Sequence, residues 1–233
     1  MTTPIHIVLS IIIADASLEL VPEEIASLPA IKAMARMRNK KPTEMIFDIS
    51  SLLPLRRKLL PDQEKRGRPD VVHRLLLTIL DSPLKSYLPM KIYLHTYKGR
   101  IFEVSPTTRL PRNYLRFLGL MEQLLMEGRV GPKDRSLIRE ISSDLESLLK
   151  SLSPKLKIAL SEKGRLEDPI DVARRILRQD TLILVGGFPH GDYSKEVKKL
   201  IDEEISLCEK VITASAAICM LLSYLFYAKR WSP

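Results

Sequence analysis

Residues 181–193 read TLILVGGFPHGDY, an apolar run that leads into a group of glycines. A short apolar run of this kind is typical of a buried strand, and Gly186 and Gly187 at its end let the backbone come close to a ligand. In α/β folds, nucleotides bind at the carboxyl edge of such strands. The glycines do not follow the dinucleotide pattern G-x-G-x-x-G, and no Gly-Lys-Ser or Gly-Lys-Thr follows them. We therefore expect a nucleoside-type ligand rather than a triphosphate.

Strand-like and helix-like segments alternate along the rest of the chain. We expect strands at residues 5–13, 90–96, 101–104, 155–160 and 181–185. We expect helices at residues 23–38, 70–80, 112–126, 135–149, 170–178 and 211–228, where apolar residues recur with helical spacing. This alternation predicts an α/β fold with a mostly parallel sheet flanked by helices. One domain is expected over residues 1–233, with the proline-containing, charged segment 40–67 as an excursion from it.

Positive charge is concentrated in the amino-terminal half. The chain has 233 residues, 45% of them apolar and 28% charged, which excludes a disordered protein. Its 37 basic and 28 acidic residues give a net charge of +9. Between Lys32 and Arg116 there are 19 basic and 7 acidic residues, and the rest of the chain holds 18 and 21. An excess confined to one part of the chain favours a polyanionic partner, most simply a nucleic acid.

The two cysteines and one uncharged segment indicate where in the cell the protein is expected and whether it enters a membrane. Cys208 and Cys219 are too few for a disulfide scaffold and have no ligands at metal-binding spacing, so no metal site is expected. Free thiols without a signal peptide favour the cytoplasm. Residues 211–228, VITASAAICMLLSYLFYA, meet the lower length limit of a transmembrane helix. Their small and hydroxyl side chains favour a helix buried in a core or a subunit interface, and we expect a soluble homodimer that does not contact the membrane.

A charged pair stands at the start of one predicted helix, in the segment 65–84, KRGRPDVVHRLLLTILDSPL. Pro69 suits the first position of a helix, and Asp70 in the first turn is favoured by the helix dipole. Its carboxylate can hold the guanidinium of Arg68 in one orientation. A guanidinium held in this way is suited to bind a phosphate or a base. A salt-bridged helix cap explains the pair equally well.

Three arginines surround the start of the next predicted helix, in the segment 104–121, VSPTTRLPRNYLRFLGLM. Arg112 and Arg116 are four residues apart, so they are expected to share one face of a helix that begins at Pro111. Arg109 lies just before that start, where free backbone amides favour an anion. This segment contains no acidic residue. The three arginines therefore have no local ion-pair partner, which favours phosphate binding over the alternative of a solvated charged face.

These segments, together with IYLHT at residues 92–96 and LVGGFPHG at residues 184–191, resemble one family. It comprises the ribosome-biogenesis methyltransferases that modify a pseudouridine of small-subunit ribosomal RNA at N1, within the SPOUT superfamily. The resemblance implies a SPOUT-type knotted methyltransferase fold, a homodimer, and S-adenosylmethionine as methyl donor. It implies that the residues in contact with the RNA are Arg68, Arg109, Arg112 and Arg116, with Asp70 steadying Arg68. It implies that the residues in contact with the cofactor are Gly186, Gly191, Leu207, Cys208, Glu209, Lys210, Val211 and Ile212.

The segment before the last predicted helix departs from the family pattern. The family has a Tyr-Pro-Leu-like turn there, whereas residues 207–215 read LCEKVITAS. The cofactor contacts at residues 207–212 are therefore aligned by position alone. This departure keeps a second function open, an RNA-binding ribosome assembly factor with the same fold and little or no catalysis. No residue is assigned as general base, and the short amino-terminal region resembles that of the archaeal-type members.

Overall fold

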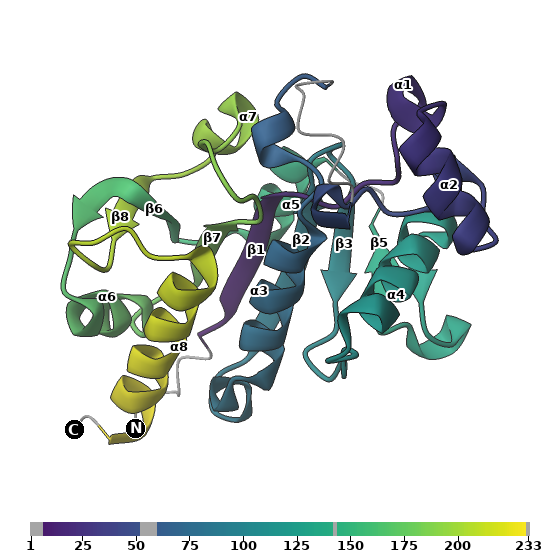
Figure 1. The fold of residues 1–233 in the computed structure, drawn as a ribbon. Helices are drawn as coiled ribbons and strands as arrows, with labels where there is room; N and C mark the ends of the chain where they lie inside the picture. Colours follow the sequence, from purple (N-terminus) through teal and green to yellow (C-terminus); the bar gives the residue numbers. More distant parts are fainter. Residues whose placement is uncertain (1–6, 52–59, 142–143, 232–233) are drawn as a thin grey trace.

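The computed structural model describes residues 7–51, 60–141 and 144–231. Their backbone forms one sheet of eight strands in the order β4-β5-β3-β2-β1-β7-β6-β8 (Figure 1). The strands are β1 (Leu9–Ala16), β2 (Met90–Thr96), β3 (Ile101–Val104), β4 (Arg129–Val130), β5 (Ile138–Glu140), β6 (Leu156–Leu166), β7 (Thr181–Gly186) and β8 (Glu203–Ser206). The strands predicted at residues 90–96 and 101–104 are confirmed.

The part of the sheet between β2 and β8 is parallel. β1 pairs with β2 and β7, and β6 pairs with β7 and β8, all in parallel. β3, β5 and β4 continue the sheet beyond β2 in antiparallel pairs. β1, LSIIIADA, is buried along its whole length, as expected of a parallel strand covered by helices on both faces. The predicted α/β fold with a mostly parallel sheet is confirmed.

Helices cover both faces of the sheet (Figure 1). The helices are α1 (Glu23–Ala26), α2 (Pro29–Met37), α3 (Pro69–Asp81), α4 (Tyr114–Glu127), α5 (Leu145–Leu152), α6 (Pro169–Ile176), α7 (Lys195–Lys198) and α8 (Ala214–Trp231). α1 and α2 pack in a separate cluster with Phe47 and do not cover the sheet. α3, α4, α6 and α8 share one buried cluster with Ile11 and Ile13 of β1. α5 and α7 share another with Ile12, because successive side chains of a strand point to opposite faces.

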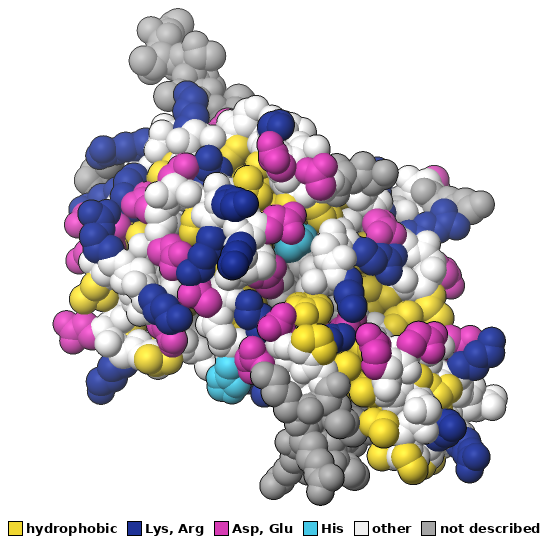
Figure 2. Space-filling view, turned by 90° about the horizontal axis from the view of Figure 1, so that it is seen from above, with side chains coloured by type: hydrophobic (Ala, Val, Ile, Leu, Met, Phe, Trp, Pro, Cys, Tyr) yellow, Lys and Arg dark blue, Asp and Glu magenta, His cyan; other side chains and the backbone are white. Residues whose placement is uncertain are grey.

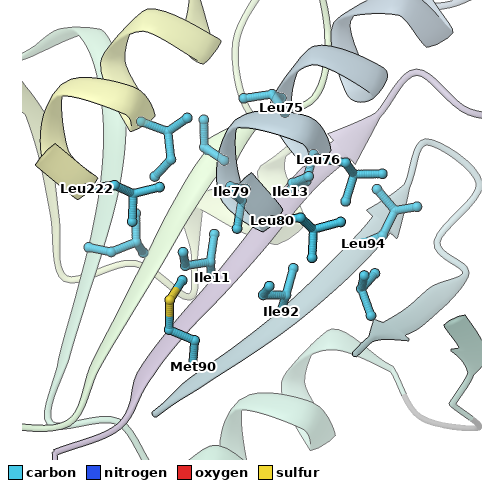
Figure 3. Close-up of a cluster of buried hydrophobic side chains, with 14 of the residues drawn as sticks. Ile11, Ile13, Leu75, Leu76, Ile79, Leu80, Met90, Ile92, Leu94 and Leu222 are labelled. Carbon is cyan, nitrogen blue, oxygen red and sulfur yellow. The ribbon is translucent and has the colours of Figure 1, made fainter. Parts of the chain in front are cut away.

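The larger core cluster joins α3 and α8 to the centre of the sheet (Figure 3). The apolar side chains of α3 recur at positions 72, 75, 76, 79 and 80, so one face of this helix is buried over β1 and β2. Leu222 of α8 belongs to the same cluster and is labelled in Figure 3. The start of α3 and the start of α8 are thereby held at fixed positions above the sheet.

Two predicted helices are wrong in extent. Residues 138–140 pair with β3 as strand β5, so residues 135–149 do not form one helix, because strand pairing overrides the local helical spacing. The helix there begins only at Leu145, where the side chain of Asp144 accepts the N–H of Ser147 at 2.7 Å. The predicted helix 23–38 is divided into α1 and α2, because Pro29 cannot occupy a helix interior and instead begins α2.

The first and last predicted elements are shifted along the chain. β1 covers Leu9–Ala16 instead of residues 5–13, of which residues 5 and 6 lie outside the described part. α8 begins at Ala214 instead of residue 211 and is buried on one side only, since Tyr227 is 56% exposed and Trp231 63% exposed. Among the described residues, no helix combines the length and the apolar character needed to cross a membrane.

Candidate functional site

A cavity of about 480 Å³ opens where β7 and β8 end. Most of its wall comes from residues 160–163 of β6, residues 185–193 after β7, and residues 205–217 between β8 and α8. We call this cavity the glycine pocket. Of the predicted cofactor contacts, the residues that line it are Gly186, Gly191, Leu207, Lys210, Val211 and Ile212. Cys208 and Glu209 belong to the same turn but do not line it.

The loop after β7 lies directly against the end of β1. The N–H of Gly187 donates to the carbonyl of Ala14, and the carbonyl of Gly187 accepts the N–H of Ser17, both at 2.8 Å. A Cβ atom at Gly187 would lie 2.7 Å from the Cα of Ala16, so this approach requires glycine. Gly191 has a φ of +104°, a conformation that side chains with a Cβ rarely adopt. The glycines therefore fix the shape of this wall.

A buried polar network closes the far end of the same loop. The Asp15 carboxylate accepts the N–H of Ser194 at 2.6 Å, and the Asp15 N–H donates to Nδ1 of His95 at 3.3 Å. Burial lowers the pKa of His95, which favours the neutral ring with Nδ1 as acceptor. The Tyr193 hydroxyl donates to the carbonyl of Leu160 at 2.7 Å, and burial raises the pKa of Tyr193. These residues were not among the predicted site residues, although Asp15, a charged residue in the otherwise apolar second half of β1, could have indicated them.

The glycine pocket has the mixed lining that an adenosine with a charged tail requires. Its apolar residues include Val185, Leu207 and Ile212, and its polar ones come from the loops around them. Within the described residues, the backbone N–H groups of Gly191, Lys210 and Ile212 donate no hydrogen bond. Such amides can bind the polar edge of a base, while the apolar residues cover its faces. The residues present therefore fit an S-adenosyl cofactor.

Arg68 lines the glycine pocket and is held in one orientation by Asp70. Its Nε and Nη2 atoms donate to the two carboxylate oxygens of Asp70 at 2.7 and 2.9 Å, as expected from the sequence. Arg74 donates to the same carboxylate at 3.1 Å. Burial raises the pKa of Asp70, but the hydrogen bonds and charge of Arg68 outweigh it, so the pKa lies below its usual value. The backbone N–H of Arg68 also donates to Ser17, which attaches this arginine to the end of β1.

The other three predicted arginines are exposed beside the start of α4. The helix begins at Tyr114, because the side chain of Asn113 caps it by accepting the N–H of Arg116 at 3.1 Å. Arg112 therefore precedes the helix, and the expectation that it shares a helix face with Arg116 is wrong. Arg112 also has an ion-pair partner, Asp81 at the end of α3, at 3.1 Å. Within the described residues, Arg109 and Arg116 have no ion pair through their side chains, as expected.

Packing between α3 and α4 joins these arginines to Arg68. Nε2 of His73 donates to the carbonyl of Pro111 at 2.8 Å, and its ring stacks on Phe117 with centroids 4.2 Å apart. The Tyr114 hydroxyl donates to Asp48 at 2.8 Å. The set Arg68, Arg109, Arg112 and Arg116 is called the arginine surface below. On the face shown in Figure 2, basic and acidic side chains are interspersed. The net charge alone therefore does not locate an RNA-binding site, and arginines without an ion pair are the better indicator of one.

Comparisons with known proteins identify close relatives. The family model described as EMG1/NEP1 methyltransferase matches residues 11–225. The chain is 42% identical to the ribosomal RNA small subunit methyltransferase Nep1 of Staphylothermus marinus, over 92% of this chain and 93% of that protein. It is 42% identical to Nep1 of Sulfurisphaera tokodaii, over 96% and 99%. The crystal structure of Archaeoglobus fulgidus Nep1 bound to S-adenosylhomocysteine matches with a TM-score of 0.82 at 35% identity, covering 93% of this chain and 96% of that chain.

Proposed function

The chain belongs to the EMG1/NEP1 methyltransferase family, and from this premise we propose how its pocket and its arginines act on RNA. It is a small-subunit ribosomal RNA methyltransferase of SPOUT-type fold that uses S-adenosylmethionine. The proposed acceptor is N1 of a pseudouridine in that RNA. One observation carries the proposal: Arg68, one of the predicted RNA-binding arginines, lines the glycine pocket. Methyl transfer requires donor and acceptor to meet at one point, and this residue marks it.

The glycine pocket is the proposed site of the methyl donor. Gly186 and Gly191 add no side chain to its wall, and Leu207, Val211 and Ile212 supply apolar surface. S-adenosylmethionine, when bound, supplies a reactive methyl group. The relative from Archaeoglobus fulgidus was solved with S-adenosylhomocysteine, which supports this assignment. The unusual segment 207–215 still forms part of the pocket wall, so no observation favours the alternative of an assembly factor without catalysis.

The arginine surface is the proposed RNA-binding site. Arg109 and Arg116 are free of ion pairs within the described residues and can bind phosphates, whereas Arg68 is held by Asp70 at the pocket. Proteins read unpaired loop bases in RNA, because the major groove of an A-form helix is too narrow for side chains. A base that reacts at a ring nitrogen must also leave its stack. We therefore expect a stem-loop bound with its target base turned toward Arg68.

The acceptor nitrogen loses its N1 proton during the transfer, and the residues near the pocket restrict where that proton goes. Asp70 is the candidate base that the sequence motif offers beside Arg68, but both of its oxygens accept hydrogen bonds from Arg68, and its pKa is lowered. A carboxylate with a lowered pKa is a weak base. Asp70 is therefore assigned as a positioning residue for Arg68, and the proton is assigned to solvent at the open side of the pocket.

A homodimer in the cytoplasm, with a carboxyl-terminal trefoil knot, is also part of the proposal. The outer face of α8 supports the homodimer, because Tyr224, Tyr227 and Trp231 are exposed there in the single chain. Tyr87 contacts Phe226 beside this face, with ring centroids 5.3 Å apart. We expect sedimentation of detergent-free protein to give a dimer, and a Tyr227→Glu variant to shift it toward monomer. A wild-type protein that stays monomeric at high concentration would contradict this part.

The central experiment measures cofactor binding and methylation separately. Calorimetric titration should show binding of S-adenosylmethionine and S-adenosylhomocysteine. Incubation with a small-subunit rRNA stem-loop that contains pseudouridine should add one methyl group at N1, detected by mass spectrometry of the digested RNA. The same stem-loop with uridine at that position is the matched control and should stay unmethylated, because the N1 atom of uridine is bonded to the ribose. Binding of both ligands without any methylation would contradict the proposed reaction.

A further inference from the structure

Two charged side chains of opposite sign line the glycine pocket without partners. Within the described residues, Glu162 and Lys210 take part in no side-chain hydrogen bond and no ion pair. The other Asp, Lys and Arg side chains of the pocket wall are engaged. Arg68 and Arg74 pair with Asp70, and Lys163 pairs with Asp192. A pocket that leaves one anion and one cation unpaired is suited to a ligand that carries both charges.

A break in the pairing of β6 with β8 places Glu162 at the pocket. Leu160 and Arg165 of β6 both pair with Ile205 of β8, so the four residues between them bulge out of the sheet. A Cβ atom at Gly164 would lie 2.5 Å from the backbone nitrogen of Ile205, which means that the return of the bulge to β8 requires glycine. The bulge is therefore built into the sheet, and residues 161–163 become part of the pocket wall.

The neighbours of Glu162 do not neutralise it. Lys163, the next residue, is directed to Asp192 at 3.2 Å, and Asp192 is shared with Lys198 at 2.7 Å. Lys210 belongs to the turn after β8, the strand that pairs with β6 on both sides of the bulge. The remaining titratable side chains of the wall in the loop after β7 are His190 and Tyr193, and the Tyr193 hydroxyl donates to the carbonyl of Leu160. Both unpaired charges are thus available to a bound molecule.

We propose that Glu162 and Lys210 bind the amino-acid end of S-adenosylmethionine, Glu162 its ammonium group and Lys210 its carboxylate. This inference rests on the proposed function and deepens it. The methionine end of the cofactor carries one charge of each sign, and charge complementarity inside a pocket determines the orientation of a ligand. The two residues would select for the complete cofactor over adenosine compounds that lack this end, and they would fix which way its chain lies.

The experiment compares four ligands by calorimetric titration. S-adenosylmethionine and S-adenosylhomocysteine carry both charges of the amino-acid end, decarboxylated S-adenosylmethionine keeps only the ammonium, and methylthioadenosine has neither. Glu162→Gln should weaken the first three about three- to tenfold and leave methylthioadenosine unchanged, since both residues are exposed and solvent screens such contacts. Lys210→Met should weaken only the two ligands that carry the carboxylate.

Glu196→Gln and Lys199→Met serve as matched controls, because both residues are exposed, lie on or beside α7, and do not line the pocket. Both should bind all four ligands like the wild type. An equal loss for methylthioadenosine in the Glu162→Gln variant would overturn the inference, because it would indicate a distorted pocket. A loss for the two sulfonium ligands with S-adenosylhomocysteine unchanged would also overturn it, because Glu162 would then face the sulfonium. A wild type that binds none of the four would contradict the proposed function itself.

Discussion

The glycine pocket and the arginine surface meet at Arg68, yet they are built from different parts of the polypeptide. The shape of the pocket is set by backbone: Gly187 lies against Ala16, and Gly164 lies against Ile205. The arginine surface is set by side chains at the starts of α3 and α4, where Asp70 holds Arg68 and Asp81 holds Arg112. A substitution that adds a side chain should therefore weaken cofactor binding at the glycine pocket, and one that removes a charge should weaken RNA binding at the arginine surface.

The largest expected effect follows from adding a side chain at Gly191. Its φ of +104° is strained for any residue with a Cβ, and that Cβ would lie 3.0 Å from Cε of Lys65. Such strain costs about 1–3 kcal/mol, so Gly191→Val should weaken S-adenosylmethionine binding roughly ten- to hundredfold by calorimetry while the chain stays folded. Gly119→Ala in α4 is the control, since a Cβ there meets nothing within 4 Å. Unchanged affinity in the Gly191→Val variant would place the ligand elsewhere.

Loss of an unpaired arginine should act on RNA and leave the cofactor unaffected. Arg116→Ala and Arg109→Ala should each weaken RNA binding and reduce the slope of log affinity against log salt by about 0.7, the value for one single-strand phosphate contact. Arg112→Ala should change the slope less, because its ion pair with Asp81 already competes for the charge. Arg178→Ala, an exposed arginine after α6, is the control. Filter binding at several salt concentrations would measure this, and identical slopes in all variants would contradict an RNA-binding role.

Asp70→Asn should have a smaller effect that depends on pH. Its carboxylate has a lowered pKa in the folded chain, so its contribution to stability is complete above the usual pKa of an aspartate and is lost as the pH falls through the folded value. We expect a loss of about 1 kcal/mol at neutral pH that disappears at low pH, measured by urea unfolding. RNA binding at neutral pH should weaken as well, because Arg68 loses its fixed orientation. A stability difference that persists unchanged in acid would show that the ion pair is not its cause.

The smallest effect is expected for the hydrogen bond between Tyr114 and Asp48, which anchors the start of α4 beside the arginine surface. Tyr114→Phe removes the hydroxyl that donates to Asp48 at 2.8 Å, while the ring stays in contact with His73. Burial and this hydrogen bond both raise the pKa of Tyr114, so the hydroxyl is a donor throughout the neutral range. Thermal unfolding should show a loss of about 0.5 kcal/mol, the low end for one hydrogen bond, with cofactor affinity unchanged. A change in cofactor affinity would mean that the two regions are coupled more closely than the contacts indicate.

Much of this protein is determined by local sequence. The apolar run of β7 and the glycines after it locate the pocket, because an uninterrupted apolar strand has to be buried and glycine alone tolerates the close approach to β1. The pairing of Arg68 with Asp70 also follows from sequence, since the two residues flank the proline that begins α3. These features depend on residues within a few positions of one another.

Other features are decided only by the tertiary structure. β5 forms in a segment with helical spacing because β3 offers a pairing partner, and β8 is a strand despite its acidic residues because β6 pairs with it. The ion pair of Arg112 with Asp81 joins residues 31 positions apart, and the bulge that brings Glu162 to the pocket exists only because β6 meets β8 twice. Such contacts are absent from the local sequence, because their energy comes from segments that become neighbours only when the chain folds.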